Sequence, residues 1–179
     1  MESKSLKFIE IPNFCTKDEC NNVITVLNAL PGDDYKWTKE LAYKVFYNPK
    51  DPILEKFIEN VVTRFIALGY DGVKYFVDLM FNCMGTGHSI QLHTDDQAQG
   101  KQTINAIVYL SDPNDYEGGF IEFPEINFSE RPAQGTLVIY DATLKHQVTK
   151  IISGSRFTAP FAFTDDPTIK ANPYNFTGI

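Results

Sequence analysis

Two of the three histidines in this 179-residue chain lie in one stretch with an aspartate, and the three side chains could share a metal ion. His93 and Asp95 are two residues apart, and His146 opens a later segment that is typical of a strand. Side chains two apart on a strand point to the same face, so His93 and Asp95 could converge while Thr94 points away. The same rule makes Asp96 the weaker candidate. We therefore expect His93, Asp95 and His146 as metal ligands.

Two imidazoles and one carboxylate on one side of a metal are the ligand set of non-haem Fe(II) oxygenases, in which other coordination positions stay open. A structural zinc site would instead be closed by four protein ligands. A His-x-Asp triplet alone is weak evidence, because such triplets also occur in turns and as surface pairs. The assignment therefore depends on what else accompanies these ligands.

Arg156 follows His146 by ten residues, within Gly154-Ser155-Arg156-Phe157-Thr158, and both could sit on the same pair of neighbouring strands. If Arg156 is buried, its guanidinium needs a carboxylate partner, because an unpaired buried charge is costly. The distal carboxylate of 2-oxoglutarate would provide that partner through two parallel hydrogen bonds. The alternative is a surface arginine on an edge strand.

Two amphipathic helices are expected before the metal-binding stretch. Thr16 and Glu19 have the spacing of a capping box, in which each side chain satisfies a free amide at the helix start. Asp51-Pro52 supplies an N-cap and a first-turn proline for a second helix, which should end near Gly69. Apolar residues recur at helical spacing in both segments, so these helices should cover one face of a sheet.

Short strands are expected near the start of the chain and throughout its second half, separated by clusters of Gly, Pro and Asp. They are residues 7–14, 41–47, 73–83, 91–93, 103–110, 119–123, 136–140, 146–152 and 157–163. Helices followed by many strands predict a mostly β protein of the α+β class, with the helices packed outside a sandwich or barrel. We expect a single domain over 1–179, with helical support mainly at 16–70, the β core mainly at 73–164 and a tail at 165–179.

The composition, 43% hydrophobic and 13% aromatic, is typical of a compact globular protein. The formal net charge of −7 disfavours nucleic acid as a partner, since such binding needs clustered Lys and Arg. Three cysteines suit a reducing compartment better than a disulfide framework. The sequence shows neither the apolar block of a signal peptide nor that of a membrane helix. We expect a soluble, cytoplasmic protein without a membrane partner.

Further motifs accompany the expected ligands. They are Gly85-Thr86-Gly87, Tyr109-Leu110-Ser111-Asp112, Glu117-Gly118-Gly119, Phe123-Pro124, the segment 132–140, and Ile11-Pro12-Asn13-Phe14 with Glu19-Cys20. Together with His93-Thr94-Asp95, His146 and the segment 154–158, they resemble the iron- and 2-oxoglutarate-binding signature of the prolyl hydroxylase-like branch of the Fe(II)/2-oxoglutarate-dependent dioxygenases. The likeness covers nearly the whole chain.

This resemblance implies a distorted double-stranded β-helix core, the cupin-like jelly roll, with iron at its mouth. It implies that Arg156 and Tyr109 bind the distal 2-oxoglutarate carboxylate and that Thr158 assists from the same strand face as Arg156. The alternative for Tyr109 is an ordinary core aromatic. Collagen-type prolyl hydroxylases have lysine where Arg156 stands, so this chain resembles the arginine-bearing branches. Related halogenases lack the carboxylate of Asp95, so its presence favours hydroxylation.

We therefore expect an Fe(II)- and 2-oxoglutarate-dependent dioxygenase that hydroxylates an organic substrate with O2 and releases succinate and CO2. We expect no catalytic residue apart from the metal ligands. The resemblance points to a prolyl residue of a peptide or a proline-like small molecule, and leaves ascorbate open as a further cofactor. The alternatives are a non-catalytic jelly roll that binds metal or a small acid, and an oxygenase acting on another small molecule. Repair of alkylated nucleic acid is disfavoured by the acidic composition.

Overall fold

The computed structural model describes residues 8–30, 36–38, 43–46, 51–70, 75–96 and 103–166. In 36–38, in 43–46 and at Asp78, the description is limited to the backbone. Of the expected tail at 165–179, only Asp165 and Asp166 are among the described residues.

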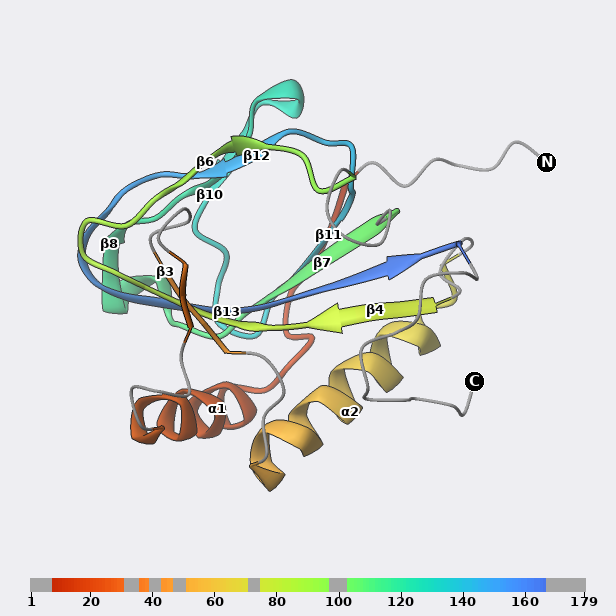
Figure 1. The fold of residues 1–179 in the computed structure, drawn as a ribbon, viewed down its shortest axis with the longest axis horizontal. Coiled ribbons are helices and arrows are strands. Elements are labelled where there is room, and N and C mark those ends of the chain that lie inside the picture. The colour runs from red at the N-terminus through yellow and green to blue at the C-terminus, as the bar shows by residue number, and fades with distance from the viewer. Residues whose placement is uncertain are drawn as a thin grey trace.

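Two helices lie on one face of a large sheet (Figure 1). Helix α1 spans Lys17–Ala29, and Thr16 and Glu19 form the expected capping box at its start. Helix α2 spans Pro52–Ala67 and begins after Asp51, whose carboxylate accepts hydrogen bonds from two first-turn amides. Neither of these described helices is long and apolar enough to cross a membrane.

The described strands form two curled antiparallel sheets that face each other across an inner core (Figure 1). They are β1 (Phe8–Ile11), β2 (Lys36–Thr38), β3 (Tyr43–Phe46), β4 (Tyr75–Leu79), β5 (Phe81–Gly85), β6 (Ile90–His93), β7 (Ile104–Tyr109), β8 (Tyr116–Gly118), β9 (Ile121–Phe123), β10 (Phe128–Glu130), β11 (Leu137–Asp141), β12 (His146–Val148) and β13 (Ile151–Thr164). The larger sheet has the order β1-β11-β7-β13-β5-β3-β2, with β4 and β8 also paired to β13. The smaller sheet has the order β10-β9-β12-β6. The mostly β expectation, with helices outside, is confirmed.

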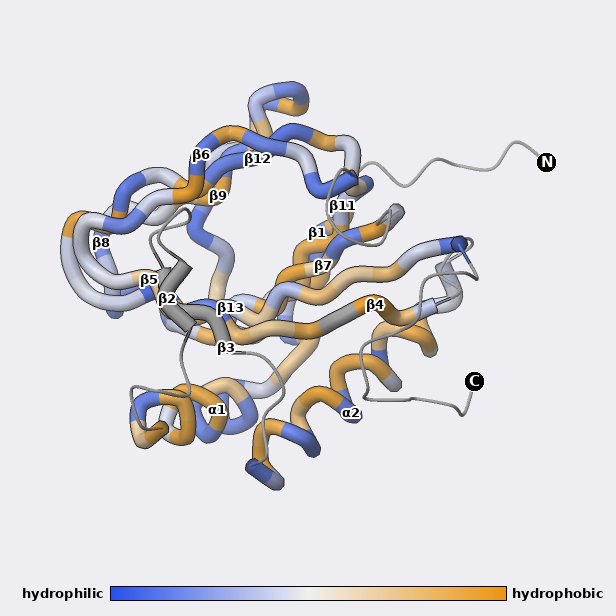
Figure 2. Tube along the Cα trace, viewed as in Figure 1, coloured by the Kyte–Doolittle hydropathy of each residue, from blue (hydrophilic) through white to orange (hydrophobic). Residues whose placement is uncertain are grey.

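Figure 2 shows hydrophobic residues along the strands of the larger sheet and along the helices. Alternation along these strands separates a helix-facing core from the inner core. On β13, Phe157 and Ala159 pack toward the helices, so Arg156 and Thr158 point to the inner core. The same rule holds on the neighbouring strands. It places these side chains on the inner face: Asn82 and Met84 on β5, Asn105 and Tyr109 on β7, and Val138 and Tyr140 on β11.

Two of the expected strands are divided differently in the structure. The expected strand 73–83 is interrupted at Met80, whose amide donates a hydrogen bond to Pro160 O. Proline has no N–H to donate in return, so the hydrogen-bond ladder between the strands breaks there. In contrast, the chain stays in strand conformation through residues 153–156, which were expected to lie between the strands 146–152 and 157–163. Gly154 has φ +77°, and a Cβ atom there would lie 2.3 Å from Asp115 O. The glycine thus allows the backbone before β8 to approach β13 closely.

The position of His146 relative to Arg156 also differs from expectation. His146 is on β12 of the smaller sheet, whereas Arg156 is on β13 of the larger sheet, and these two strands are not paired with each other. The expectation that both would sit on one pair of neighbouring strands is wrong. The two side chains instead come from facing sheets. They can therefore act together only in the space between those sheets.

Candidate functional site

The three expected metal ligands are brought together at one edge of the smaller sheet. His93 is the last residue of β6 and His146 the first of β12, and the two are directly opposite each other in the antiparallel pair. Their ring centroids are 4.3 Å apart. Asp95 follows β6, and its carboxylate lies beside both rings.

Asp95 reaches this site through a turn and not through strand alternation. The strand ends at His93, and the chain bends at Asp95. The amides of Asp95 and Asp96 both donate to Ala142 O, at 2.9 and 3.1 Å. The expected reason for the convergence of His93 and Asp95 was therefore wrong, although the side chains do converge. A backbone contact with the β11–β12 loop sets the direction of the carboxylate.

The candidate ligand atoms have the spacing of an open metal site. Asp95 Oδ1 lies 3.3 Å from His93 Nε2, and Asp95 Oδ2 lies 3.4 Å from His146 Nε2. The ligand atoms of all three residues are within 4.8 Å of one another. Two ligands at right angles and each ~2.1 Å from one ion are ~3 Å apart, so small shifts would place these atoms around one metal. These residues could hold a single ion from one side.

Backbone carbonyls orient both imidazoles toward Asp95. His93 Nδ1 is 2.7 Å from Gln91 O, and His146 Nδ1 is 3.1 Å from Leu144 O. A carbonyl only accepts, so in each neutral ring Nδ1 carries the proton and donates it. Nε2 then keeps its lone pair, the form in which imidazole binds a metal.

The electrostatic environment favours the protonation states that a metal requires at Asp95 and His146. Burial raises the pKa of Asp95, but the hydrogen bond from protonated His93 and the positive charge that each histidine carries when protonated outweigh it and leave the pKa below its usual value. Burial lowers the pKa of His146, which favours the neutral form that binds a metal. The hydrogen bond with Asp95 raises the pKa of His93, so a proton competes with metal there.

Asn105 and Tyr140 also contact these ligands, and neither was expected to. Asn105 Nδ2 donates to Asp95 Oδ2. The Tyr140 hydroxyl donates to the same oxygen at 3.1 Å and lies 3.3 Å from His146 Nε2. Burial, reinforced by Asp95, raises the pKa of Tyr140 well above its usual value, so the hydroxyl remains a donor. One sequence signal was available: Asn105 is a polar residue that shares a strand face with Tyr109.

Arg156 is buried in the inner core without a carboxylate partner. Its side chain is 2% exposed, and among the described residues no Asp or Glu forms an ion pair with it. Its Nε–H makes no hydrogen bond to a described residue, and Nη1 contacts Met84 Sδ at 3.7 Å. A buried cation without a partner is costly, so this position fits a bound anion.

Tyr109 and Thr158 lie beside this guanidinium. The Tyr109 ring centroid is 5.1 Å from Arg156 Cζ, and Tyr109 and Thr158 are directly opposite each other on β7 and β13. Burial raises the pKa of Tyr109, and the Arg156 charge offsets only part of this effect. Among the described residues, the Tyr109 O–H proton has no acceptor. A carboxylate placed here would accept hydrogen bonds from this O–H and from the Arg156 Nε–H, which lack an acceptor in the described part of the chain.

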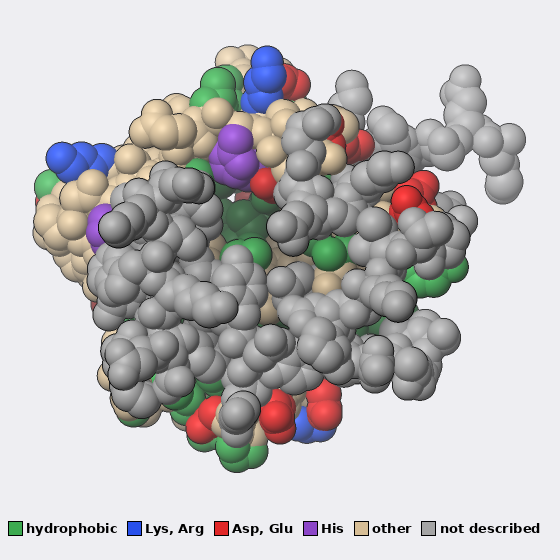
Figure 3. Space-filling model, viewed as in Figure 1, with side chains coloured by type: hydrophobic (Ala, Val, Ile, Leu, Met, Phe, Trp, Pro, Cys, Tyr) green, Lys and Arg blue, Asp and Glu red, His purple; other side chains and the backbone are tan. Residues whose placement is uncertain are grey.

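The surface is hollowed in the region where Figure 1 labels β6 and β12, as the same view in Figure 3 shows. A histidine and an acidic side chain lie at the edge of this hollow, and hydrophobic side chains lie inside it (Figure 3). The mixture suits an organic ligand, because apolar walls bind its carbon atoms while a few polar groups fix its orientation.

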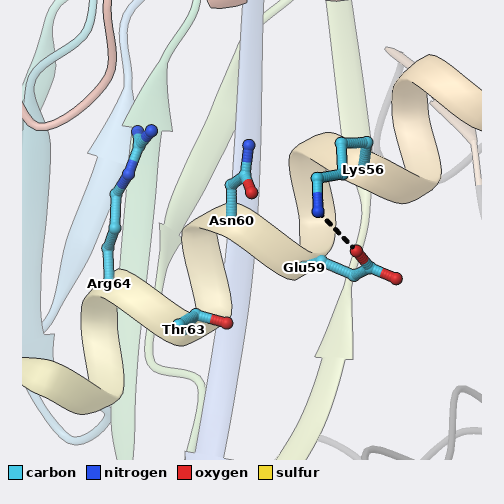
Figure 4. Close-up of a pocket in the computed structure, with 5 residues that line it drawn as sticks. All are labelled: Lys56, Glu59, Asn60, Thr63 and Arg64. Carbon is cyan, nitrogen blue, oxygen red and sulfur yellow. Dashed lines mark hydrogen bonds and ion pairs between the residues drawn. The ribbon is translucent and has the colours of Figure 1, made fainter.

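A second depression lies on the outer side of α2, away from this chemistry (Figure 4). It is lined by Lys56, Glu59, Asn60, Thr63 and Arg64. Lys56 and Glu59 form an ion pair of 3.1 Å across it. All five side chains come from one helix on the opposite face of the larger sheet from the inner core, so this depression has no part in the candidate site.

Comparison with known proteins places the chain in a family. Residues 79–163 match the 2OG-Fe(II) oxygenase superfamily. A PKHD-type hydroxylase of Hyphomonas neptunium is 31% identical over 167 residues, which cover 83% of this chain and 74% of the relative.

Solved structures agree with this placement at the level of the fold. The viral collagen prolyl hydroxylase of Paramecium bursaria Chlorella virus-1, solved as a 2OG complex, has a TM-score of 0.70 at 19% identity, over 93% of this chain and 99% of that one. HygX of Streptomyces hygroscopicus, solved with nickel and 2-oxoglutarate bound, has a TM-score of 0.69 at 17% identity, over 92% and 84% of the two chains. The expected jelly-roll core is thus confirmed.

The matched segment contains the His-Asp-His group and the Arg156 strand, and the similarity to the hydroxylase relative extends over most of both chains. The donor set and the unpaired buried cation fit an iron ion and a 2-oxo acid. The chain therefore belongs to the 2OG-Fe(II) oxygenase superfamily and is a 2-oxoglutarate-dependent dioxygenase that uses Fe(II) and 2-oxoglutarate.

Proposed function

We propose that His93, Asp95 and His146 hold Fe(II) and that Arg156 and Tyr109 bind the distal carboxylate of 2-oxoglutarate. The observation that carries this assignment is the buried Arg156 guanidinium beside the Tyr109 hydroxyl, where the Arg156 Nε–H and the Tyr109 O–H both lack an acceptor among the described residues. A barrel that bound only metal would have no use for this costly arrangement. A dicarboxylate that binds the metal through one end would accept hydrogen bonds from the Arg156 guanidinium and the Tyr109 hydroxyl through the carboxylate at its other end. Thr158, next to Tyr109 on the inner face, supports the same end.

When bound, Fe(II) and 2-oxoglutarate supply the oxidative chemistry, in which 2-oxoglutarate, O2 and a substrate C–H give succinate, CO2 and a C–OH. The protein's residues supply position and exclusion of water. The three ligands approach from one side, so positions for the 2-oxo acid and O2 stay free. Arg156 and Tyr109 fix the far end of the co-substrate, and the inner core keeps bulk water away from it.

Succinate formation tests the site assignment directly. We expect the wild-type protein to convert 2-oxoglutarate to succinate only when Fe(II) and O2 are present. Asp95→Ala should abolish this turnover, because it removes one of the three ligands. Normal succinate formation by Asp95→Ala, without added carboxylate, would rule out the proposed triad.

For the substrate, we infer a prolyl residue of a peptide or a proline-like small molecule. Support comes from the curated relative, a PKHD-type hydroxylase, and from the fold of a viral collagen prolyl hydroxylase. Prolyl peptides and free cyclic amino acids should gain the mass of one oxygen atom in step with succinate release. If proline-containing candidates gain no oxygen while another small molecule does, the inference on the substrate is wrong and the cofactor assignment stands.

A further inference from the structure

We propose that Asn105 and Tyr140 form a clamp on Asp95 Oδ2, which limits Asp95 to one coordination position and keeps the rest of the metal shell open. This inference rests on the proposed function, because it takes Asp95 as a metal ligand. Asn105 and Tyr140 act here as positioning residues, since they contact the ligand and not the reacting atoms.

The clamp is built by strand pairing. Asn105 on β7 and Tyr140 on β11 are directly opposite each other, so both side chains leave the same inner face. Both reach the same carboxylate oxygen, Asn105 through Nδ2 and Tyr140 through its hydroxyl at 3.1 Å. The two residues are 5% and 3% exposed, so water has little access to replace either donor. They are ordered by the sheet, which makes their hold on Asp95 rigid.

The two oxygens of Asp95 therefore have different surroundings. Oδ2 accepts two hydrogen bonds, which occupy its lone-pair directions. Oδ1 faces His93 Nε2 at 3.3 Å and is the oxygen that remains available to a metal. Without the clamp, a carboxylate can bind a metal through both oxygens. That second bond would occupy a position that the co-substrate or O2 needs.

Metal binding should tighten the clamp. The Tyr140 hydroxyl has one proton and two neighbouring acceptors, Asp95 Oδ2 at 3.1 Å and His146 Nε2 at 3.3 Å. A metal on His146 Nε2 uses the lone pair of that nitrogen, so Asp95 Oδ2 becomes the remaining acceptor. The Tyr140 hydroxyl then donates its proton only to Asp95 Oδ2, so the clamp and the bound metal stabilise each other.

Metal affinity in the absence of 2-oxoglutarate measures the clamp apart from turnover. We expect Co(II) titrations to show ~10–100-fold weaker binding for Asn105→Leu and for Tyr140→Phe, the usual effect of removing a partner of a metal ligand. Two matched variants serve as controls, Asn82→Leu and Tyr116→Phe. They make the same changes of residue type at the inner core of the larger sheet without removing a hydrogen bond to Asp95, so their Co(II) affinity should equal that of the wild type.

The number of metal-bound waters tests the role in keeping positions open, which a merely structural residue would not affect. With Mn(II) bound, water-proton relaxation should report fewer bound waters in the Asn105→Leu/Tyr140→Phe double variant than in the wild type. Infrared difference spectra should show the Asp95 carboxylate changing from one-oxygen to two-oxygen coordination. Circular dichroism and thermal unfolding of each variant identify any that fail to fold.

The outcomes separate this inference from the proposed function. If Asp95→Ala binds Co(II) as tightly as the wild type, the triad is wrong and the clamp with it. If Asp95→Ala loses Co(II) but the folded clamp variants keep wild-type affinity and bound waters, the clamp is wrong and the triad stands. If the controls weaken as much as the clamp variants, the effect is general to the inner face, and the clamp is again wrong.

Discussion

Arg156 is the residue whose surroundings constrain the chemistry most. Its guanidinium is buried and its Nε–H has no acceptor in the part of the chain that the structure describes, a cost that a bound carboxylate would remove. The metal ligands show the opposite situation, since each already has a partner in the protein. Binding of the co-substrate should therefore depend on Arg156 more than the stability of the fold does.

Replacing Arg156 with methionine tests that dependence. Losing one member of a buried, hydrogen-bonded charge pair costs ~2–5 kcal/mol, so the KM for 2-oxoglutarate should rise by ~30-fold or more. Co(II) affinity measured without 2-oxoglutarate should be unchanged. The melting temperature without ligands should equal or exceed that of the wild type, because an unpaired buried charge has been removed. An unchanged KM would show that another group anchors the co-substrate.

The two ligand histidines set the pH dependence of metal binding. The Asp95 hydrogen bond raises the pKa of His93 above 6.5, so a proton must leave this ring before Nε2 binds metal. His146, with its lowered pKa, does not compete in the same range. Co(II) affinity should be constant above the His93 pKa and fall as pH drops through it, approaching ~10-fold per pH unit for one proton. Titrations in buffers on both sides of neutrality measure this slope, and a flat profile would contradict it.

At the scale of elements, the helices are joined to each other by charge as well as by packing. Arg64 of α2 donates to both carboxylate oxygens of Glu19 on α1, at 3.0 and 2.7 Å. It also donates to Phe14 O at 3.2 Å, in the chain that leads from β1 to α1. This contact keeps the pKa of Glu19 at about 2 and links both helices to the first strand.

Glu19→Gln should weaken this link while largely keeping the helix cap, because a glutamine oxygen can still accept from the Thr16 amide. We expect the free energy of unfolding at neutral pH to fall by ~1–2 kcal/mol. A carboxylate with a depressed folded-state pKa stabilises above its unfolded value of 4.5 and loses that effect as pH falls toward about 2. The difference in unfolding free energy between the variant and the wild type, measured by urea unfolding, should therefore disappear as the pH falls from 4.5 toward about 2.

The exposed Lys56–Glu59 pair on α2 provides the control for this prediction. Its partners are three residues apart on the helix, and both are mostly exposed. Glu59→Gln should therefore change the free energy of unfolding by less than ~0.5 kcal/mol. If Glu19→Gln has as small an effect as Glu59→Gln, the Glu19–Arg64 contact does not stabilise the helix pair.

At the scale of the whole molecule, the helix-facing core and the inner core share the larger sheet. Strand β13 contributes aromatic side chains to the first core and Arg156 and Thr158 to the second. Neither core can lose its packing without disturbing the strand that carries both. We therefore propose that the chain is one cooperative domain.

Thermal unfolding tests this single domain. The helical signal in the far ultraviolet and the aromatic signal in the near ultraviolet should change together in one transition. Mn(II) with 2-oxoglutarate should shift that whole transition, adding ~1.4 kcal/mol for each tenfold rise in ligand above its Kd. Two separate transitions, with only the aromatic one shifted by ligand, would contradict a single domain.

Features that depend on local spacing could be predicted from the amino-acid sequence alone. Capping residues and apolar periodicity identified both helices, because a helix start needs its free amides satisfied within one turn. The types of the candidate ligands and the alternation along β13 were likewise readable, because a strand has a period of two. These local rules led to the mostly β class and to the candidate metal ligands, and the resemblance to the prolyl hydroxylase-like oxygenases supported the iron and 2-oxoglutarate chemistry.

Which strand faces meet could be learned only from the folded chain. Asp95 is aimed by a contact with Ala142, and His146 and Arg156 come from facing sheets and not from neighbouring strands. Asn105 and Tyr140 meet at Asp95 because β7 pairs with β11 in one particular register. A period of two tells which side of a strand a residue occupies, but it carries no information on the strand's neighbours. The neighbours of a strand are settled when the loops close and both cores are buried together, and this depends on the whole chain.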